Sequence, residues 1–115
     1  MNVELPVLEP ARELGQGCCA DVSLDIARER AERLVAVAKA LGDPVRLQIV
    51  DVLRRRAGEV CVCDLQALFP ISQPTLSHHL KKLRAAEIAG VVRRGQWAYY
   101  YVNPESLEDL RTWLS

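Results

Sequence analysis

The 115-residue chain contains few aromatic residues, with two Trp, three Tyr and one Phe, and it lacks any long hydrophobic run. Its core must therefore consist mainly of Leu, Val, Ala and Ile. No stretch approaches the roughly 18 consecutive apolar residues of a membrane-spanning helix, and no charged-then-apolar secretion signal opens the chain. We expect one cytoplasmic domain with a modest core and no membrane partner.

The chain also lacks a net charge, because 15 basic residues balance 15 acidic ones. The charges are nevertheless unevenly placed. Residues 71–102 carry five basic side chains against the single acidic residue Glu87, a net charge of +4, so the remainder carries −4. A basic segment on an acidic body is typical of nucleic-acid binding, although so few cations predict weak non-specific affinity.

The segment 71–87 predicts a short helix with an abrupt start. The side chain of Ser72 can cap the free amides of the first turn, and Pro74 fits there because first-turn N–H groups have no intrahelical partner. Apolar residues then recur at spacings of four and three, which gives the helix one stripe to pack inward. That stripe consists of Leu76, Leu80 and Leu83.

The other face of this helix carries hydrogen-bonding side chains in front and cations behind, with no carboxylate before Glu87. Such a face suits the major groove of DNA, where polar tips read base edges and cations contact phosphates. Taken alone, the helix would fit an ordinary protein surface equally well. We interpret His78 as facing DNA and His79 as packed or directed to a phosphate, and neither as a metal ligand. The candidate DNA-contacting residues of the helix are Gln73, Thr75, Ser77, His78, His79, Lys81, Lys82 and Arg84.

The neighbouring segments favour DNA binding. A shorter helix is expected at about 63–69, and a tight turn joins it to the helix above, which makes a helix-turn-helix with the later helix as its recognition helix. Residues 88–102 predict a hairpin with its turn around 94–95. A hairpin in this place is a wing. Arg93 and Arg94 at its tip could reach a phosphate or a minor groove, or simply keep the tip soluble.

Three further helices are predicted, spanning about 24–41, 44–56 and a last segment that starts after Asn103-Pro104. The second of these is apolar around most of its girth and should lie in the middle of the fold. The sequence therefore predicts a mainly α fold with a β-hairpin wing, a winged helix-turn-helix of order α-α-α-α-β-β-α. Apolar stripes on the first and last helices exceed what so small a domain can cover. We expect a symmetric homodimer that presents two recognition helices to two DNA half-sites.

The N-terminal residues 1–23 contain Pro and Gly and show no sustained apolar period. We expect them to form a flexible arm ahead of a winged-helix domain at 24–115 that binds DNA and dimerises. The arm carries the first of two cysteine pairs, Cys18 and Cys19. Neighbouring cysteines seldom form a disulfide with each other, because the geometry is strained.

The second pair, Cys61 and Cys63, is separated by one residue. These two side chains can share one ion only where their segment is extended or lies at a helix start, since positions two apart on a helix face nearly opposite ways. A helix start would also lower the thiol pKa. Either cysteine alone would fit a buried core position. Together with the arm, however, the four thiols indicate a three- or four-sulfur site for a soft ion.

Several spaced motifs resemble those of the ArsR/SmtB family of metal-responsive repressors. They lie at residues 40–47, 61–65, 72–81 and 94–100. The resemblance covers about 24–114 and implies a winged-helix homodimer that binds its operator in the apo form and leaves it when a metal or metalloid binds. It implies that Cys61 and Cys63 belong to the family's thiolate sensing site. In members with an N-terminal arm, cysteines placed like Cys18 and Cys19 supply further ligands, often to the partner subunit.

One departure concerns the number of thiols. The family's arsenic sensors often have a third cysteine shortly after the pair, whereas Gln66 and Ala67 stand here. A third thiolate for As(III) or Sb(III) would have to come from Cys18 or Cys19. We predict As(III) or Sb(III) as the inducer, because two adjacent cysteines are poorly placed to wrap one tetrahedral ion. The alternative is Cd(II), Pb(II) or Zn(II) bound by four thiolates.

Two other functional classes stay open. A thiol redox-sensing winged-helix regulator would use the same cysteines, with peroxide in place of a metal. A thiol enzyme or metal carrier has little support, because the sequence lacks a Cys-x-x-Cys motif, a general base near any cysteine and a phosphate-binding loop. We expect a transcriptional repressor that is not an enzyme and whose partners are double-stranded operator DNA and a second copy of the chain.

Overall fold

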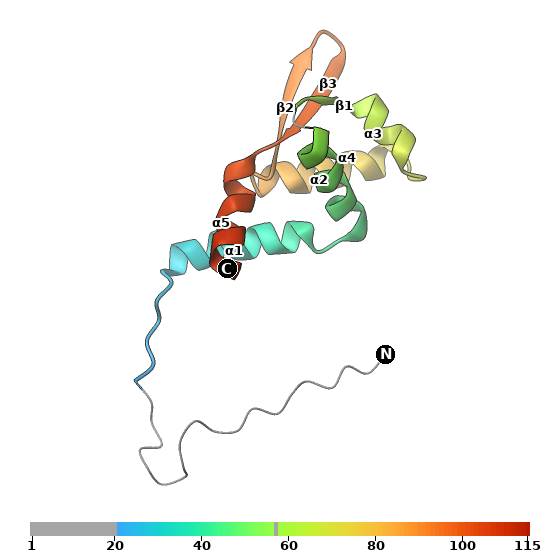
Figure 1. The fold of residues 1–115 in the computed structure, drawn as a ribbon. Helices are drawn as coiled ribbons and strands as arrows, with labels where there is room; N and C mark the ends of the chain where they lie inside the picture. Colours follow the sequence, from blue (N-terminus) through green and yellow to red (C-terminus); the bar gives the residue numbers. More distant parts are fainter. Residues whose placement is uncertain (1–20, 57) are drawn as a thin grey trace.

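The computed structural model describes residues 21–56 and 58–115 (Figure 1). Within these residues the chain forms five helices and one three-stranded antiparallel sheet, which confirms the predicted winged helix-turn-helix and adds one strand, β1. No helix of the described part is both long and apolar enough to cross a membrane. The elements are α1 (Arg28–Leu41), α2 (Pro44–Arg56), β1 (Val60–Cys61), α3 (Val62–Leu68), α4 (Gln73–Ala85), β2 (Ala89–Arg94), β3 (Trp97–Val102) and α5 (Pro104–Leu114).

Helix α1 begins at Arg28, so the predicted start at Leu24 is wrong. Ala27 precedes the helix in an extended conformation, and its side chain makes no capping hydrogen bond. Leu24 is 93% exposed. The Leu24 side chain therefore does little to offset the entropy of ordering another helical turn. The helix ends before Gly42, as predicted, and the N–H of Gly42 donates to the carbonyl of Lys39.

Helix α2 lies in the middle of the fold, as its composition predicts (Figure 1). Ile49 and Leu53 are fully buried, and the core around them draws on α1, the helix-turn-helix and all three strands. The prediction holds for most of the girth of α2 and fails at Leu47, which is exposed. One side of the central helix is therefore left uncovered by the rest of the chain that the structure describes.

Asp43 caps the start of α2. Its Oδ2 accepts a hydrogen bond from the N–H of Arg46 at 3.1 Å. This hydrogen bond is the main reason why the pKa of the Asp43 carboxyl lies below its usual value; burial opposes the effect, and the neighbouring His79 adds to it. The ionised carboxylate is thus the form that the folded helix start favours.

We expect Asp43→Asn to make the stability of the fold less sensitive to acid. The pKa of Asp43 is lower in the folded chain than its unfolded value of about 3.9, so the ionised cap stabilises the native state above that pH, and this contribution is lost as the pH falls through the folded pKa. Asn caps helices about as well as Asp, so stability near neutral pH should change little. Urea midpoints of both proteins, measured from about pH 7 to about pH 3, test this; parallel curves would contradict it.

The wing is the β2–β3 hairpin, which projects from the helical body (Figure 1). Its two turn residues are Gly95 and Gln96, so Arg94 is the last residue of β2 rather than part of the turn. Gly95 has a φ of 62°. A positive φ at the first central residue is what a type II′ hairpin turn requires, and glycine adopts it without steric cost.

The third strand, β1, consists of two residues and pairs with β3, which lies at the centre of the sheet. Val60 is opposite Tyr100 and Cys61 is opposite Tyr99. The sequence prediction assigned no strand here, because two residues show no periodicity and the partner strand is distant in sequence. This pairing brings the second cysteine pair to the base of the wing.

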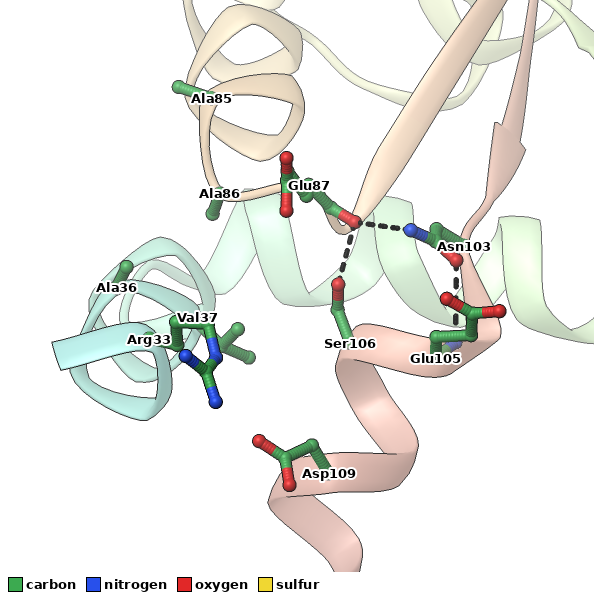
Figure 2. Close-up of a pocket in the computed structure, with 10 residues that line it drawn as sticks. All are labelled: Arg33, Ala36, Val37, Ala85, Ala86, Glu87, Asn103, Glu105, Ser106 and Asp109. Carbon is green, nitrogen blue, oxygen red and sulfur yellow. Dashed lines mark hydrogen bonds between the residues drawn. The ribbon is translucent and has the colours of Figure 1, made fainter. Parts of the chain in front are cut away.

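The end of α4 is tied to the start of α5. Helix α4 ends at Ala85, earlier than the predicted end at Glu87, whose φ of 60° takes it out of the helix. The carbonyl of Glu87 accepts hydrogen bonds from Asn103 Nδ2 at 3.1 Å and Ser106 Oγ at 2.8 Å. Figure 2 shows this junction beside a pocket of about 450 Å³ between α1 and α5. These hydrogen bonds tie the end of α4 to the start of α5.

Candidate DNA interface and thiol site

Helix α4 has the start and the inner stripe that the sequence predicts. Ser72 Oγ accepts the N–H of Thr75 at 3.3 Å and lies 2.8 Å from Thr75 Oγ1. Pro74 occupies the first turn. The buried residues of the helix are Leu76, Leu80 and Leu83.

The predicted DNA-contacting residues of α4 fall into two groups in the structure. Most of them are exposed and share the face away from the leucine stripe, so they are free to meet an external surface. His79 differs, because its side chain is mostly buried. The exposed ones are Gln73, Thr75, Ser77, His78, Lys81, Lys82 and Arg84.

His79 packs against the junction of α1 and α2, one of the two roles that the sequence left open for it. Its Nδ1 lies 3.2 Å from Nη1 of Arg46 and 3.9 Å from Oδ2 of Asp43. Because a guanidinium can only donate, a hydrogen bond between these two groups has Nδ1 as its acceptor. Arg46 also donates through Nε to the carbonyl of Ala40 at 2.6 Å. Arg46 therefore links the end of α1 to the recognition helix, a role that the sequence analysis did not predict.

The two wing arginines lie on opposite faces of the sheet. Side chains alternate along a strand, and Arg93 is opposite Ala98 whereas Arg94 is opposite Trp97. Ala98 is buried against the core, and Trp97 is exposed on the outer face. Arg93 thus shares the inner face, toward the helical body, and is itself exposed beyond the core.

On the outer face, Arg94 is bound to Glu59. Arg94 Nη2 donates to Glu59 Oε1 at 2.9 Å, and Nη1 donates to Oε2. The same guanidinium lies 5.3 Å from the ring centroid of Tyr99. The ion pair with Glu59 raises the pKa of Arg94 above its ordinary value. Sequence reasoning missed Glu59, because no local signal pairs it with a partner 35 residues away.

Cys61 and Cys63 meet at the junction of β1 and α3. Cys61 is extended at the end of the strand and precedes α3, while Cys63 lies in the first helical turn. Their Sγ atoms are 2.6 Å apart. The structure thus has the arrangement that the sequence requires for a shared ion: an extended residue followed by a helix start. Cys63 is exposed and Cys61 is half-buried, so the sulfurs are open to solvent on one side.

The predicted lowering of thiol pKa at this helix start is wrong for Cys63. Its pKa is raised, chiefly by the hydrogen bond with Cys61, and further by desolvation and by the negative charges of Cys61 and Asp64. A neighbouring sulfur that shares a proton stabilises the thiol form more than the short helix stabilises the thiolate.

The other cysteine pair, Cys18 and Cys19, lies outside the described residues. Within residues 21–56 and 58–115, no group of three or more His, Cys, Asp or Glu side chains is placed to hold a metal ion. A three- or four-sulfur site that used Cys61 and Cys63 would therefore need at least one further ligand from outside the described residues.

Comparison with known proteins places this arrangement in a family. The sequence profile described as "Bacterial regulatory protein, arsR family" matches residues 43–90, which run from the cap of α2 into β2. The transcriptional repressor SdpR of Bacillus subtilis (strain 168) is 40% identical over 68% of this chain and 84% of its own length. The chain belongs to the ArsR family. Several of its relatives are named for resistance to arsenicals or cadmium.

The arsenical resistance operon repressor of Staphylococcus xylosus is 43% identical over 67% of this chain and 72% of its own length. The "cadmium resistance transcriptional regulatory protein CadC homolog" of Staphylococcus aureus is 36% identical over 75% of this chain and 70% of its own length. Among solved structures, the transcriptional repressor BigR from Xylella fastidiosa has a TM-score of 0.61 and 30% identity, covering 73% of this chain and 85% of that one. This ArsR protein is therefore a DNA-binding transcriptional repressor and not an enzyme.

Proposed function

We propose that this ArsR repressor binds its operator as an apo homodimer and is released when its thiolates bind As(III) or Sb(III). The observation that carries the proposal is the 2.6 Å separation of the Cys61 and Cys63 sulfurs beside the helix-turn-helix. Two adjacent sulfurs suit one soft ion, and a trivalent metalloid needs one more. We assign that third thiolate to Cys18 or Cys19, from the same chain or its partner. Reduced thiols of this kind fit a cytoplasmic protein.

The exposed face of α4 is proposed to enter the major groove. Its first turns carry uncharged polar groups such as Gln73, Thr75 and Ser77, which can hydrogen-bond to base edges. The cations Lys81 and Lys82 follow and suit phosphates. Arg93 lies on the face of the wing that is directed toward the helical body, and we assign it to a phosphate contact as well.

Replacing Arg93 with Ala is expected to weaken binding to all duplexes by a similar factor. A bound dimer would lose one phosphate contact per subunit, so the slope of log affinity against log salt should fall by about two. Anisotropy titrations at several salt concentrations measure this. Arg54→Ala is the matched control, because Arg54 lies exposed in the last turn of α2 and pairs with Asp51. An unchanged slope for Arg93→Ala would remove this residue from the interface.

The dimer is proposed to form through α1 and α5. An apolar groove of about 230 Å³ between them is lined by Val35, Leu110 and Trp113, among others. Val35 is 50% exposed and Trp113 is 53% exposed, more than a single domain of this size usually leaves open on one face. A second copy related by a twofold axis would cover both helices and direct two α4 helices to successive half-sites.

Sedimentation equilibrium at micromolar concentration is expected to give twice the mass of the chain. Trp113→Glu places a charge in the groove and should shift the equilibrium to monomer, while helical content stays the same. A monomeric wild-type protein would contradict the dimer.

Cadmium is the second candidate, since one relative is named as a CadC homolog. Four thiolates, two from the arm and two from Cys61 and Cys63, would then surround Cd(II), Pb(II) or Zn(II). X-ray absorption of the bound ion distinguishes the candidates. Three sulfurs around arsenic support the first proposal, and four around cadmium support the second.

Operator release tests the sensing function as a whole. A duplex selected by the full-length protein from random sequences would be titrated alone and with arsenite, antimonite, cadmium, lead or diamide. We expect arsenite or antimonite to weaken binding by roughly 5–150-fold, the usual range of such coupling. If only diamide releases the duplex, the protein is a thiol redox regulator. If no ion weakens binding, the metal-sensing proposal is wrong.

A further inference from the structure

Strand β1 joins the cysteine pair to the wing. Cys61 is paired with Tyr99, a residue of the wing's second strand β3. The cysteine site and the DNA-contacting hairpin therefore belong to one sheet, with β3 as the shared strand (Figure 1). A change in the backbone at Cys61 acts on β3 directly through these ladder hydrogen bonds.

A second link runs through Glu59, the residue before β1. Its carboxylate accepts both N–H groups of the Arg94 fork, and Arg94 lies over the ring of Tyr99. Exposed ion pairs are usually weak, but a bidentate arginine–carboxylate pair is the exception, because its geometry is well defined. The wing tip is thus held to the segment that leads into the cysteine pair.

The same contact places Arg94 between two partners. It is the last residue of the first wing strand, where a phosphate could reach it, yet Glu59 engages two of its nitrogens. A phosphate would have to replace that carboxylate. The position of Glu59 therefore influences both the orientation of the wing and whether Arg94 is free for DNA.

We propose that Glu59 is a positioning residue that transmits ligand binding at Cys61 and Cys63 to the wing through Arg94. The inference rests on the proposed function. Glu59 and Cys61 are two positions apart in an extended segment, so their side chains share one face. An ion held by the two sulfurs selects one backbone arrangement of the β1–α3 junction. The carboxylate of Glu59 shifts with it, and Arg94 and the wing tip follow.

Among the ion pairs of residues 21–56 and 58–115, this is the one that joins the wing to the segment before β1. A purely structural pair would rigidify the hairpin equally in the presence and absence of an ion. A positioning residue instead changes how much the ion alters DNA affinity. The two roles are therefore separable by measuring coupling rather than stability.

The test uses the full-length chain, the selected operator duplex and sodium arsenite or cadmium chloride as the probe. The variants are Glu59→Gln, Arg94→Lys and the double variant. Arg94→Lys keeps the positive charge but cannot make the two-pronged contact. Asp51→Asn is the matched control, because it removes other exposed arginine–carboxylate pairs, those with Arg54 and Arg55 on α2, away from the proposed DNA and dimer surfaces. Operator affinity with and without the ion, and ion affinity from thiolate absorption, are measured for each.

We expect Glu59→Gln to bind the ion as tightly as wild type while the ion's effect on operator affinity falls by roughly fivefold or more. Arg94→Lys should act similarly, and the double variant should add no further loss, since both changes break one link. Asp51→Asn should behave as wild type. Wild-type coupling in Glu59→Gln, or additive losses in the double variant, would overturn this inference and leave the sensing function intact. If neither arsenite nor cadmium releases the wild-type protein from the operator, the proposed function is wrong, and this inference, which rests on it, is wrong as well.

Discussion

In the double variant Cys61→Ser/Cys63→Ser, arsenite is expected to have no effect on operator binding, while the affinity for the operator stays close to that of wild type. Serine keeps the size of both side chains but offers no thiolate to a soft ion. Cys63 is exposed and Cys61 is half-buried, and neither belongs to the buried core, so the exchange leaves the core intact. The roughly 5–150-fold decrease in operator affinity that arsenite should cause in the wild-type protein is therefore expected to vanish. Anisotropy titrations with and without arsenite measure it.

The arm provides the companion experiment. The single variants Cys18→Ser and Cys19→Ser should show which thiol completes the site. The variant that lacks the third ligand should bind arsenite weakly, whereas the other variant should bind it as tightly as wild type. A thermal melt of each variant confirms that the fold is retained. Release of the operator by arsenite from a chain without any cysteine would show that the thiols do not sense the ion.

Leu80→Ala is expected to destabilise the domain by about 2–5 kcal/mol. Leu80 is 1% exposed and belongs to the central core that α4 shares with α2 and the sheet. Removing its side chain leaves a cavity under the recognition helix, and that loss is a large share of the 5–15 kcal/mol that typically separates folded from unfolded domains. Urea unfolding at a fixed protein concentration measures it, since a dimer's stability depends on concentration.

Leu68→Ala is the matched control for this change. Leu68 lies at the end of α3 and is 58% exposed, so the same deletion should alter stability by no more than about 0.5 kcal/mol. An equal decrease in the free energy of unfolding for the two variants would show that α4 does not pack on the core as described. A small loss for Leu80→Ala alone would mean that the cavity collapses around the missing side chain.

The helix-turn-helix and wing were predictable because their signals are local. Ser72 and Pro74 mark the start of α4, and three leucines at helical spacing mark its buried face. The β-branched and aromatic residues around Gly95 mark the hairpin in the same way. Prediction was less accurate at Leu24, where an apolar residue continues the pattern of α1 but has nothing to pack against.

The sequence by itself determined which segments form the helices and the hairpin, and it set Cys61 and Cys63 two positions apart. Only the tertiary structure decided that a two-residue strand pairs Cys61 with Tyr99 and that Glu59 binds Arg94. It also placed His79 against Arg46 instead of in solvent. Helix caps and periodicity depend on neighbours within a few residues. A partner more than 30 residues away is one of many candidates of the right charge, and only chain packing selects it.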